Sequence, residues 1–201
     1  KTVVCGEIAR RSRNGKAIAF ATFTGKAKRV LEEKLKFSDS IRQGDFIGTL
    51  HSFLMKANIS YVDREDGRIE KVVRFEDKDS DSRYSCVIID EASMVDEEMF
   101  ARAEKLGVPI VAVGDHGQLP PIMRGFNLME SPMIRLEKIH RQAEGNAIIR
   151  VAAVARETGV IPFGEIGAVL KTSDKSVLNT LDFREWTFIC GTNKLRTRLN
   201  A

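Results

Sequence analysis

The sequence has few residues of the kinds that build disulfide frameworks or soft-metal centres. Its 201 residues include three cysteines and three histidines. Cys5, Cys86 and Cys190 are odd in number, far apart and form no C-x-x-C pair, so we expect reduced thiols in a cytoplasmic protein. The histidines lack the spacing of metal ligands, which argues against a structural zinc site.

Long apolar runs are also missing. The longest are short stretches such as Val87-Ile88-Ile89, far below the roughly 18 residues that a membrane helix needs. No segment has the charged-then-apolar build of a secretory signal, and we find no internal repeat. These absences argue against a membrane protein, a secreted scaffold or a solenoid. An apolar fraction of 43% predicts a globular chain with one large domain or two small ones.

The charge is unevenly distributed. The net charge of +4 is too small to indicate nucleic-acid binding. However, residues 1–31 carry eight basic side chains against a single acid, Glu7, whereas residues 63–81 are rich in aspartate and glutamate. One face is therefore expected to meet a polyanion, although a solvated helix surface explains the basic end equally well.

Two apolar runs that end in polar residues predict the fold class. Residues 85–94 and 108–115 each read as a buried strand, and a helix is expected between them at 96–106. Strands of this kind separated by helices indicate a parallel sheet buried on both faces, so the predicted class is α/β. We also expect helices at 3–11, 25–36 and 145–156, strands at 16–22 and 186–193, and a linker-like segment at 157–167. In the first helix, Val3, Val4, Ile8 and Ala9 have helical spacing.

A charged hairpin is expected between residues 57 and 84. Two alternating segments flank Asp66-Gly67, a dipeptide typical of two-residue hairpin turns. We interpret it as an insertion into the sheet.

The acids at the end of the first apolar run favour catalysis. Because neighbouring side chains at a strand end point differently, one of Asp90 and Glu91 can face a metal ion while the other faces a water molecule. The structural alternative is a pair of surface acids at the start of the next helix.

The second run ends in the loop GDHGQLPPI at 114–122, where Pro120-Pro121 stiffens the chain. Its Gln118 amide is suited to sensing a terminal phosphate through water, and a plain turn is the alternative. Lys1-Thr2 before a helix matches the end of a G-x-x-x-x-G-K-[ST] phosphate loop whose glycines would precede Lys1. An arbitrary Lys–Thr pair is the alternative there.

Taken together, VIIDEASMV and GDHGQLPP resemble motifs II and III of superfamily 1 DNA helicases of the RecD/Dda-like, 5′→3′ branch. The segments TFTGKAK (22–28), TLHSF (49–53), LEKIHRQ (136–142) and GTNKLRTRLN (191–200) resemble further motifs of that family, in the same order. Phe23 departs from a proline that is common there, and packing is the favoured explanation for it.

The resemblance implies an ATP- and Mg²⁺-dependent site. Lys1 would contact the β- and γ-phosphates, while Thr2 and Asp90 would hold Mg²⁺. Glu91 would activate the hydrolytic water, and Gln118 would link the γ-phosphate to the DNA track. Arg141 would act as an arginine finger, although an exposed arginine at a helix start is the alternative. Gly114 and Asp115 are expected beside the nucleotide.

The resemblance also implies a nucleic-acid track and partners. The positions expected to touch the backbone of single-stranded DNA are Thr24, Lys26, Thr49, His51 and Ser52, for which helix capping is the alternative. The hairpin would be the pin that splits DNA duplex junctions. Replication or repair proteins are implied as further partners.

The implied architecture is a RecA-like P-loop NTPase domain at 1–142, with the hairpin inserted at 57–84, followed by the incomplete start of a second RecA-like domain at 143–201. Two other functions stay open: a PhoH-like or other P-loop NTPase that acts on RNA, and a non-catalytic DNA-binding module.

Overall fold

The computed structural model describes residues 1–64, 68–78, 83–118, 120–121, 125–136, 146–182, 185–187 and 189–199. The chain divides into two compact units, Lys1–Leu136 and Glu137–Ala201.

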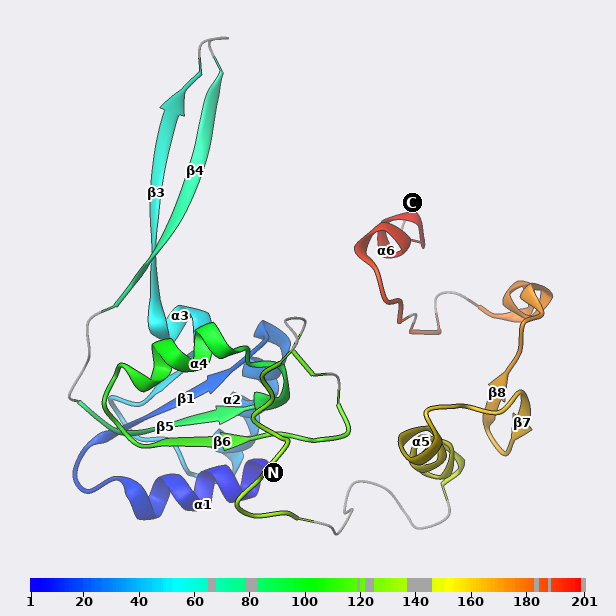
Figure 1. The fold of residues 1–201 in the computed structure, drawn as a ribbon, viewed down its shortest axis with the longest axis horizontal. Helices are drawn as coiled ribbons and strands as arrows, with labels where there is room; N and C mark the ends of the chain where they lie inside the picture. The colour runs from blue at the N-terminus through cyan, green and yellow to red at the C-terminus, as the bar shows by residue number, and fades with distance from the viewer. Residues whose placement is uncertain are drawn as a thin grey trace. The chain divides into compact units, whose positions relative to one another are not determined.

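The first unit is built on a parallel sheet of four strands in the order β2-β1-β5-β6 (Figure 1). Its strands are β1 (Ala17–Thr22), β2 (Phe46–Thr49), β5 (Tyr84–Asp90) and β6 (Ile110–Val113). The predicted parallel α/β sheet is therefore confirmed.

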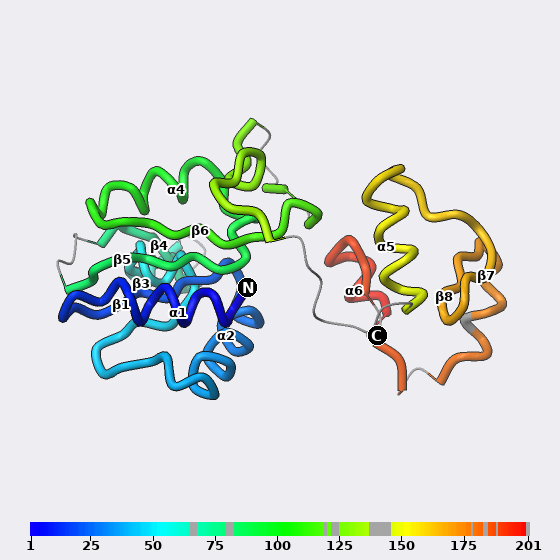
Figure 2. Tube along the Cα trace, turned by 90° about the horizontal axis from the view of Figure 1, so that it is seen from below, coloured from blue at the N-terminus to red at the C-terminus, as the bar shows by residue number. Residues whose placement is uncertain are grey.

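Helices cover both faces of this sheet. α1 (Thr2–Ser12) and α2 (Gly25–Phe37) pack on one face, and α3 (Leu50–Leu54) and α4 (Glu97–Glu104) pack on the other. Figure 1 shows α4 above the strands and α1 below them, and in the tube trace, which is seen from below, α1 overlaps β1 (Figure 2). Because successive side chains of a strand point to opposite faces, Ile18 and Phe20 pack toward α1 and α2, whereas Ala19 and Ala21 pack toward α3. The result is a three-layer domain with a core on each face of the sheet.

The apolar face expected for α1 is correct for Ile8 and Ala9, which pack in the core, and wrong for Val3 and Val4, which are exposed. The helix buries Cys5, Gly6 and Ala9, while the side chain of Val3 is 78% exposed. The reason is a close approach: a Cβ atom on Gly6 would lie 2.5 Å from Ser40 Oγ. Since the small residues allow α1 to lie close to its neighbours, they face inward and the valines remain outside.

The strand β6 was expected to be buried on both faces. Its side chains do pack on both cores, Ile110 and Ala112 on one and Val111 and Val113 on the other, but their burial is incomplete. All four of its residues are half-buried. In the described part of the sheet, β6 pairs with β5 along one edge. An edge strand has a neighbour on one side, so its side chains receive less cover than those of β1 or β5.

A long antiparallel hairpin projects from the sheet (Figure 1). It consists of β3 (Met55–Asp63) and β4 (Ile69–Asp77), and the expected turn at Asp66-Gly67 lies outside the described residues. An ion pair between Asp77 and Arg102 ties its base to α4. Lys78 Nζ donates a hydrogen bond of 2.6 Å to the backbone oxygen of Ser52 in α3. The base of the hairpin is thereby connected to two helices of the sheet domain.

The second unit contains small elements. These are α5 (Ala147–Thr158), β7 (Gly164–Ile166), β8 (Val169–Lys171), the 3-10 helix η2 (Lys175–Thr180) and α6 (Asn193–Leu199). The helix expected near 145–156 is present, with Asn146 and Gly159 as its caps. The 157–167 segment, expected as a linker, contributes β7 to a short antiparallel pair.

The strand expected at 186–193 is wrong for the described residues of that segment. Trp186 is 57% exposed and Ile189 is 95% exposed, and Asn193 already begins α6. A strand is stable when a neighbour accepts and donates its backbone hydrogen bonds, and no described strand lies alongside this segment. The assignment of 143–201 as the start of a second RecA-like domain stays a prediction. Among the described helices, none combines the length and apolar character that crossing a membrane requires.

Candidate functional site

The carboxyl ends of the four parallel strands lie in register. Asp90 at the end of β5 is paired with Thr22 on β1 and with Val113 on β6, and Thr22 is paired with Thr49 on β2. The loops that leave all four strands therefore start from one edge of the sheet. In open α/β sheets, ligands bind beyond this edge.

Lys1 and Glu91 meet at this edge. The Nζ atom of Lys1 lies 3.4 Å from Glu91 Oε2, and the two side chains are 19% and 25% exposed. Glu91 has a φ of 57°, a left-handed conformation that is uncommon for a residue with a side chain. Strained backbone of this kind is concentrated at functional sites. Lys1 is the N-cap of α1, so the ion pair places the beginning of that helix beside the acidic strand end.

Asp90 is the buried member of the acidic pair. It is 7% exposed, and burial raises the pKa of its carboxyl group. The N–H of Glu91, which donates to Asp90 Oδ1 at 3.0 Å, lowers that pKa, while the negative charge of Glu91 raises it further. A cation beside the carboxylate would favour its ionised form.

The donors near the strand end are suited to Mg²⁺. The described residues contain no group of three or more His, Cys, Asp and Glu side chains arranged to hold a metal. Mg²⁺ does not need such a group, because it usually binds one or two protein oxygens together with substrate phosphates and water. The carboxylate of Asp90 and the hydroxyl of Thr2, the first residue of α1, are hard oxygen donors of this type.

The glutamine loop leaves β6 next to the acidic strand end. The N–H of Gly117 donates to Asp115 Oδ1 at 3.0 Å, and the N–H of Gln118 donates to the backbone oxygen of Asp115 at the same distance. These bonds form a compact turn that places Gln118 at the same sheet edge as Asp90. Ser93, which the sequence did not single out, approaches the Gln118 side chain from the segment after Glu91.

Residues 1–176, most of the chain, match the AAA domain family. The chain belongs to this family. Its parallel sheet with helices on both faces is the RecA-like architecture of a P-loop NTPase domain, which binds nucleotides. A stretch of 76 residues is 36% identical to the ATP-dependent RecD2 DNA helicase of Deinococcus radiodurans. That stretch covers 34% of this chain and 11% of the helicase, so the similarity concerns a small part of the relative.

The residues expected to touch DNA lie where β1 and β2 end, at the same edge of the sheet as Asp90. Thr24 caps α2 by accepting from the N–H of Ala27, and Thr49 caps α3 by accepting from the N–H of Ser52. Capping, the structural alternative, is thus a role that both threonines have. Ser52 Oγ donates to the backbone oxygen of Thr49 at 2.8 Å, and Lys26 is exposed in the first turn of α2.

An aromatic pair lies between these caps. The rings of Phe23 and His51 meet edge to face with centroids 5.8 Å apart. Phe23 is half-buried against the core, which agrees with the packing role expected for it. His51 is exposed on α3. Arg141, the expected arginine finger, lies outside the described residues, so its role stays a prediction.

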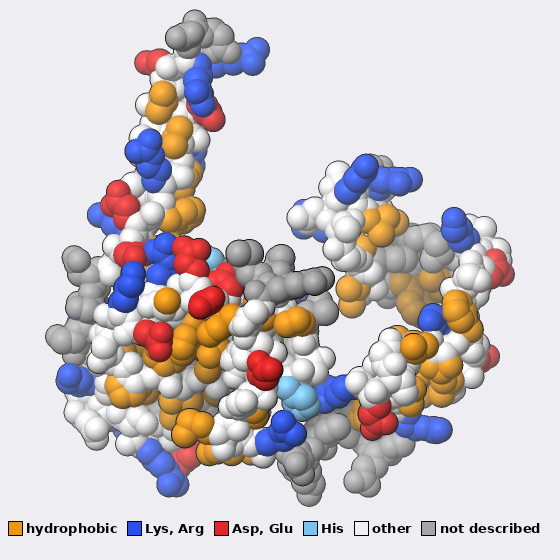
Figure 3. Space-filling model, viewed as in Figure 1, with side chains coloured by type: hydrophobic (Ala, Val, Ile, Leu, Met, Phe, Trp, Pro, Cys, Tyr) orange, Lys and Arg blue, Asp and Glu red, His pale blue; other side chains and the backbone are white. Residues whose placement is uncertain are grey.

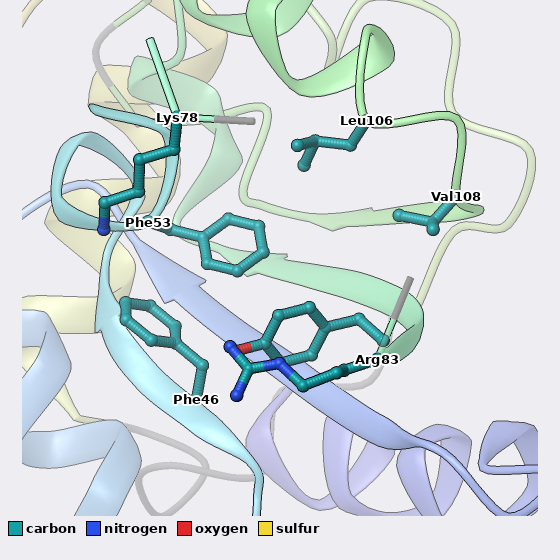
Figure 4. Close-up of a pocket in the computed structure, with 7 residues that line it drawn as sticks. Phe46, Phe53, Lys78, Arg83, Leu106 and Val108 are labelled. Carbon is teal, nitrogen blue, oxygen red and sulfur yellow. The ribbon is translucent and has the colours of Figure 1, made fainter. Parts of the chain in front are cut away.

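A cavity of about 170 Å³ lies at the opposite end of the sheet, where β2 and β5 begin (Figure 4). Aromatic, basic and aliphatic side chains line it: Phe46, Phe53, Tyr84, Lys78, Arg83, Leu106 and Val108. Because the length of β5 separates this end from Asp90, the cavity does not belong to the sheet edge that carries Asp90 and Glu91.

Proposed function

We propose that this AAA domain protein is an ATP-dependent DNA helicase that couples ATP hydrolysis to movement along single-stranded DNA in the 5′→3′ direction. One observation carries the proposal: the ammonium group of Lys1 lies 3.4 Å from Glu91, directly beside the buried Asp90. A cation for phosphate and two carboxylates with different environments are the groups that hydrolysis of a nucleoside triphosphate requires. The partial similarity to a protein named as a DNA helicase supports the choice of DNA.

In this proposal the phosphates of ATP bind at the start of α1. The helix has no acidic residue in its first turn, and Lys1 caps it without a side-chain hydrogen bond to its N–H groups. Unpaired N–H groups at a helix N-terminus attract anions. Lys1 leaves Glu91 and binds the β- and γ-phosphates, while Thr2 and Asp90 provide oxygen ligands for Mg²⁺. When bound, Mg²⁺ neutralises negative charge on the phosphate oxygens.

Glu91 has a separate task. It is more exposed than Asp90, and its left-handed backbone turns the chain away from the strand. Once Lys1 binds phosphate, the Glu91 carboxylate is free to accept a proton from the attacking water. Gln118 donates from its amide to the γ-phosphate or to that water. Arg141 is proposed to complete the site as an arginine finger, with Gly114 and Asp115 beside the nucleotide.

DNA is proposed to lie along the β1 and β2 side of the same edge. Thr24 and Thr49 use their oxygens as helix caps, and the Thr49 hydroxyl donates to Ser52 Oγ at 3.0 Å. The Thr24 hydroxyl and the first-turn N–H groups of α2 are therefore the groups best suited to phosphate, and Thr49 would need to release Ser52 to join them. Lys26 adds a positive charge there, and Ser52 and His51 extend the track on α3. Contacts of this kind hold a strand without selecting its sequence, as a moving enzyme requires.

The hairpin is proposed to separate the duplex. Cross-strand pairing places Ile59 opposite Val73 and Ala57 opposite Phe75 on one face. Much of this apolar face is exposed, with Ile59 53% and Phe75 63% accessible, and the space-filling view shows apolar side chains along the projecting hairpin (Figure 3). Apolar surface that emerges between charged residues is suited to contact bases at a junction.

The proposal is tested by strand displacement with the full-length protein, ATP and Mg²⁺. The substrates are a DNA duplex with a 5′ overhang, the same duplex with a 3′ overhang, and an RNA copy of each. We expect displacement of the 5′-overhang DNA. Glu91→Gln should lower ATP turnover by about a hundredfold or more, the range for removal of a general base, with nucleotide binding retained. Glu97→Gln, an exposed acid in α4, is the control.

Other outcomes separate the alternatives. Near-wild-type turnover in Glu91→Gln would reject the assignment of the site. Displacement confined to RNA would favour the RNA-directed NTPase, and an absence of ATP hydrolysis with and without DNA would favour a non-catalytic binding module. Displacement confined to the 3′ overhang would overturn the direction alone.

A further inference from the structure

A buried serine lies between the acidic end of β5 and the glutamine loop that follows β6. Ser93 is in the 3-10 helix η1 (Ala92–Met94), directly after Glu91, and it is 2% exposed. Its Oγ atom is 3.4 Å from Gln118 Oε1, so the hydroxyl donates to the carbonyl end of the glutamine amide. A buried hydroxyl without a hydrogen-bond partner is unfavourable, so we expect the Ser93 O–H to point to this oxygen.

The contact depends on Gly114. A Cβ atom at this position would lie 3.0 Å from the backbone nitrogen of Ser93 and 2.4 Å from Met129 Sδ. The end of β6 therefore passes against η1 at a distance that a side chain would not allow. This close approach brings the loop that carries Gln118 next to Ser93, although 25 positions separate the two residues in the sequence.

The orientation of the Gln118 amide follows from these contacts. Its backbone is held by the turn at Asp115, and its side-chain oxygen faces Ser93. An amide has an acceptor end and a donor end, so an oxygen that is engaged by a hydroxyl leaves the NH₂ group to point elsewhere. A phosphate oxygen or a water that attacks phosphorus needs a donor. If the amide were reversed, its oxygen would face the negative phosphate.

We propose that Ser93 is a positioning residue, which keeps the NH₂ group of Gln118 directed at the γ-phosphate side of the site. This inference rests on the proposed function, because it concerns the same hydrolytic reaction. Ser93 does not touch the nucleotide in this arrangement and acts through Gln118. The serine also connects the glutamine loop to the segment that holds Asp90 and Glu91, which are three and two positions before it.

The test is a double-mutant cycle with the full-length protein. DNA-stimulated ATP hydrolysis is measured for wild type, Ser93→Ala, Gln118→Ala and the double variant. We expect Ser93→Ala to lower kcat by about three- to tenfold, the size of a lost neutral hydrogen bond, with little change in KM for ATP. In the Gln118→Ala background the same substitution should have no further effect, because the group that it positions is gone.

Two further variants separate positioning from general packing. Ser93→Thr keeps the hydroxyl and should retain more activity than Ser93→Ala. Ser85→Ala removes a hydroxyl from the other end of β5, where Ser85 Oγ donates to the backbone oxygen of Ala17 at the same 3.4 Å. We expect Ser85→Ala to leave kcat unchanged. The change in its melting temperature shows what the loss of one such hydrogen bond does to stability, and the change in Ser93→Ala is compared with it.

The outcomes are distinguishable. Wild-type kcat in Ser93→Ala, or an equal loss in the presence and absence of Gln118, would overturn the inference and leave the helicase proposal standing. A wild-type protein that hydrolyses no ATP would overturn both. A non-additive loss that Thr partly restores would support the positioning role.

Discussion

The Nζ atom of Lys1 and the Oε2 atom of Glu91 lie 3.4 Å apart, although 90 positions separate them in the chain. The pair joins the N-terminus of α1 to the residue that follows β5. Each side chain is partly exposed, so the ion pair itself adds little to stability. Its significance lies in the proposed reaction, in which Lys1 is the cation that binds phosphate and Glu91 is the carboxylate that activates water.

Replacement of this lysine should weaken nucleotide binding. Lys1→Ala removes a charged donor to phosphate, and charge-assisted hydrogen bonds of this kind correspond to about a 10- to 100-fold change in Kd for ATP. Titration with a fluorescent ATP analogue measures the effect. Lys36→Ala, which removes an exposed lysine paired with Glu32, is the matched control and should bind as wild type. Equal affinity in the two variants would contradict the assignment of Lys1.

Shortening the hairpin should separate hydrolysis from unwinding. Since Ile59 and Val73 are opposite each other, residues 60–72 can be replaced by Asn-Gly, a two-residue turn that keeps this pairing. Strand displacement should fall to background, while ATP hydrolysis stimulated by single-stranded DNA should persist, because the sheet edge is unchanged.

A matched pair of point variants refines this prediction. Val73 lies on the apolar face with Ile59, whereas its neighbour Val72 lies on the opposite face with Ser60. Val73→Ser should reduce displacement more than Val72→Ser does. Equal displacement by the shortened hairpin and by wild type would remove the hairpin from the unwinding step.

A buried ion pair should make stability depend on acid pH. Arg13 donates to both carboxylate oxygens of Asp45, at 2.6 and 2.7 Å, and the Asp45 side chain is fully buried. Burial by itself would raise the pKa of Asp45. The bonds from Arg13 and from the N–H groups of Ile18 and Arg42 outweigh that effect and hold the pKa below its ordinary value of 3.8. Folding therefore favours the ionised carboxylate.

Acid should remove the stabilisation that this ion pair provides. The stabilisation is fully present above the ordinary pKa of 3.8 and is lost as the pH falls through the lower value of the folded state. Asp45→Asn leaves the Arg13 charge buried without its partner and should lower the free energy of unfolding at pH 7 by about 3–5 kcal/mol. Urea denaturation between pH 7 and pH 2 measures the difference, which should shrink below pH 4. Glu32→Gln, from an exposed pair, should change stability little.

The cysteines should differ in reactivity. Burial, together with the nearby charge of Asp90, raises the pKa of Cys5 to about 12, and burial also raises the pKa of Cys86. Cys190 is half-buried. At pH 8 about one Cys5 in ten thousand is a thiolate, so iodoacetamide should label Cys190 first. Peptide mass analysis after timed labelling measures this order, and denaturant should abolish it. Fast labelling of native Cys5 would contradict the packing of α1 on the sheet.

Much of the first unit was predictable because its apolar runs in the sequence coincide with strands that pack in the core. The apolar run before Asp90 and the one before Gly114 each predict a strand, and parallel strands place both endings at one edge. The helix expected from residue 96 is also present as α4, with Asp96 as its cap, since capping preferences are local. The choice of Asp90, Glu91 and Gln118 as candidates needed this pattern and the family resemblance.

The tertiary structure decided the features that depend on contacts between segments distant in the sequence. The sequence could not show that α1 turns Cys5 and Gly6 inward and leaves Val3 exposed, because this depends on how closely the helix approaches Ser40. It also predicted a strand at 186–193, where no described neighbour offers the backbone hydrogen bonds that a strand needs. By itself the sequence determined the α/β class and the polar strand ends. The contacts of Lys1 with Glu91 and of Ser93 with Gln118 were decided by folding, since they join side chains that distant segments bring together in space.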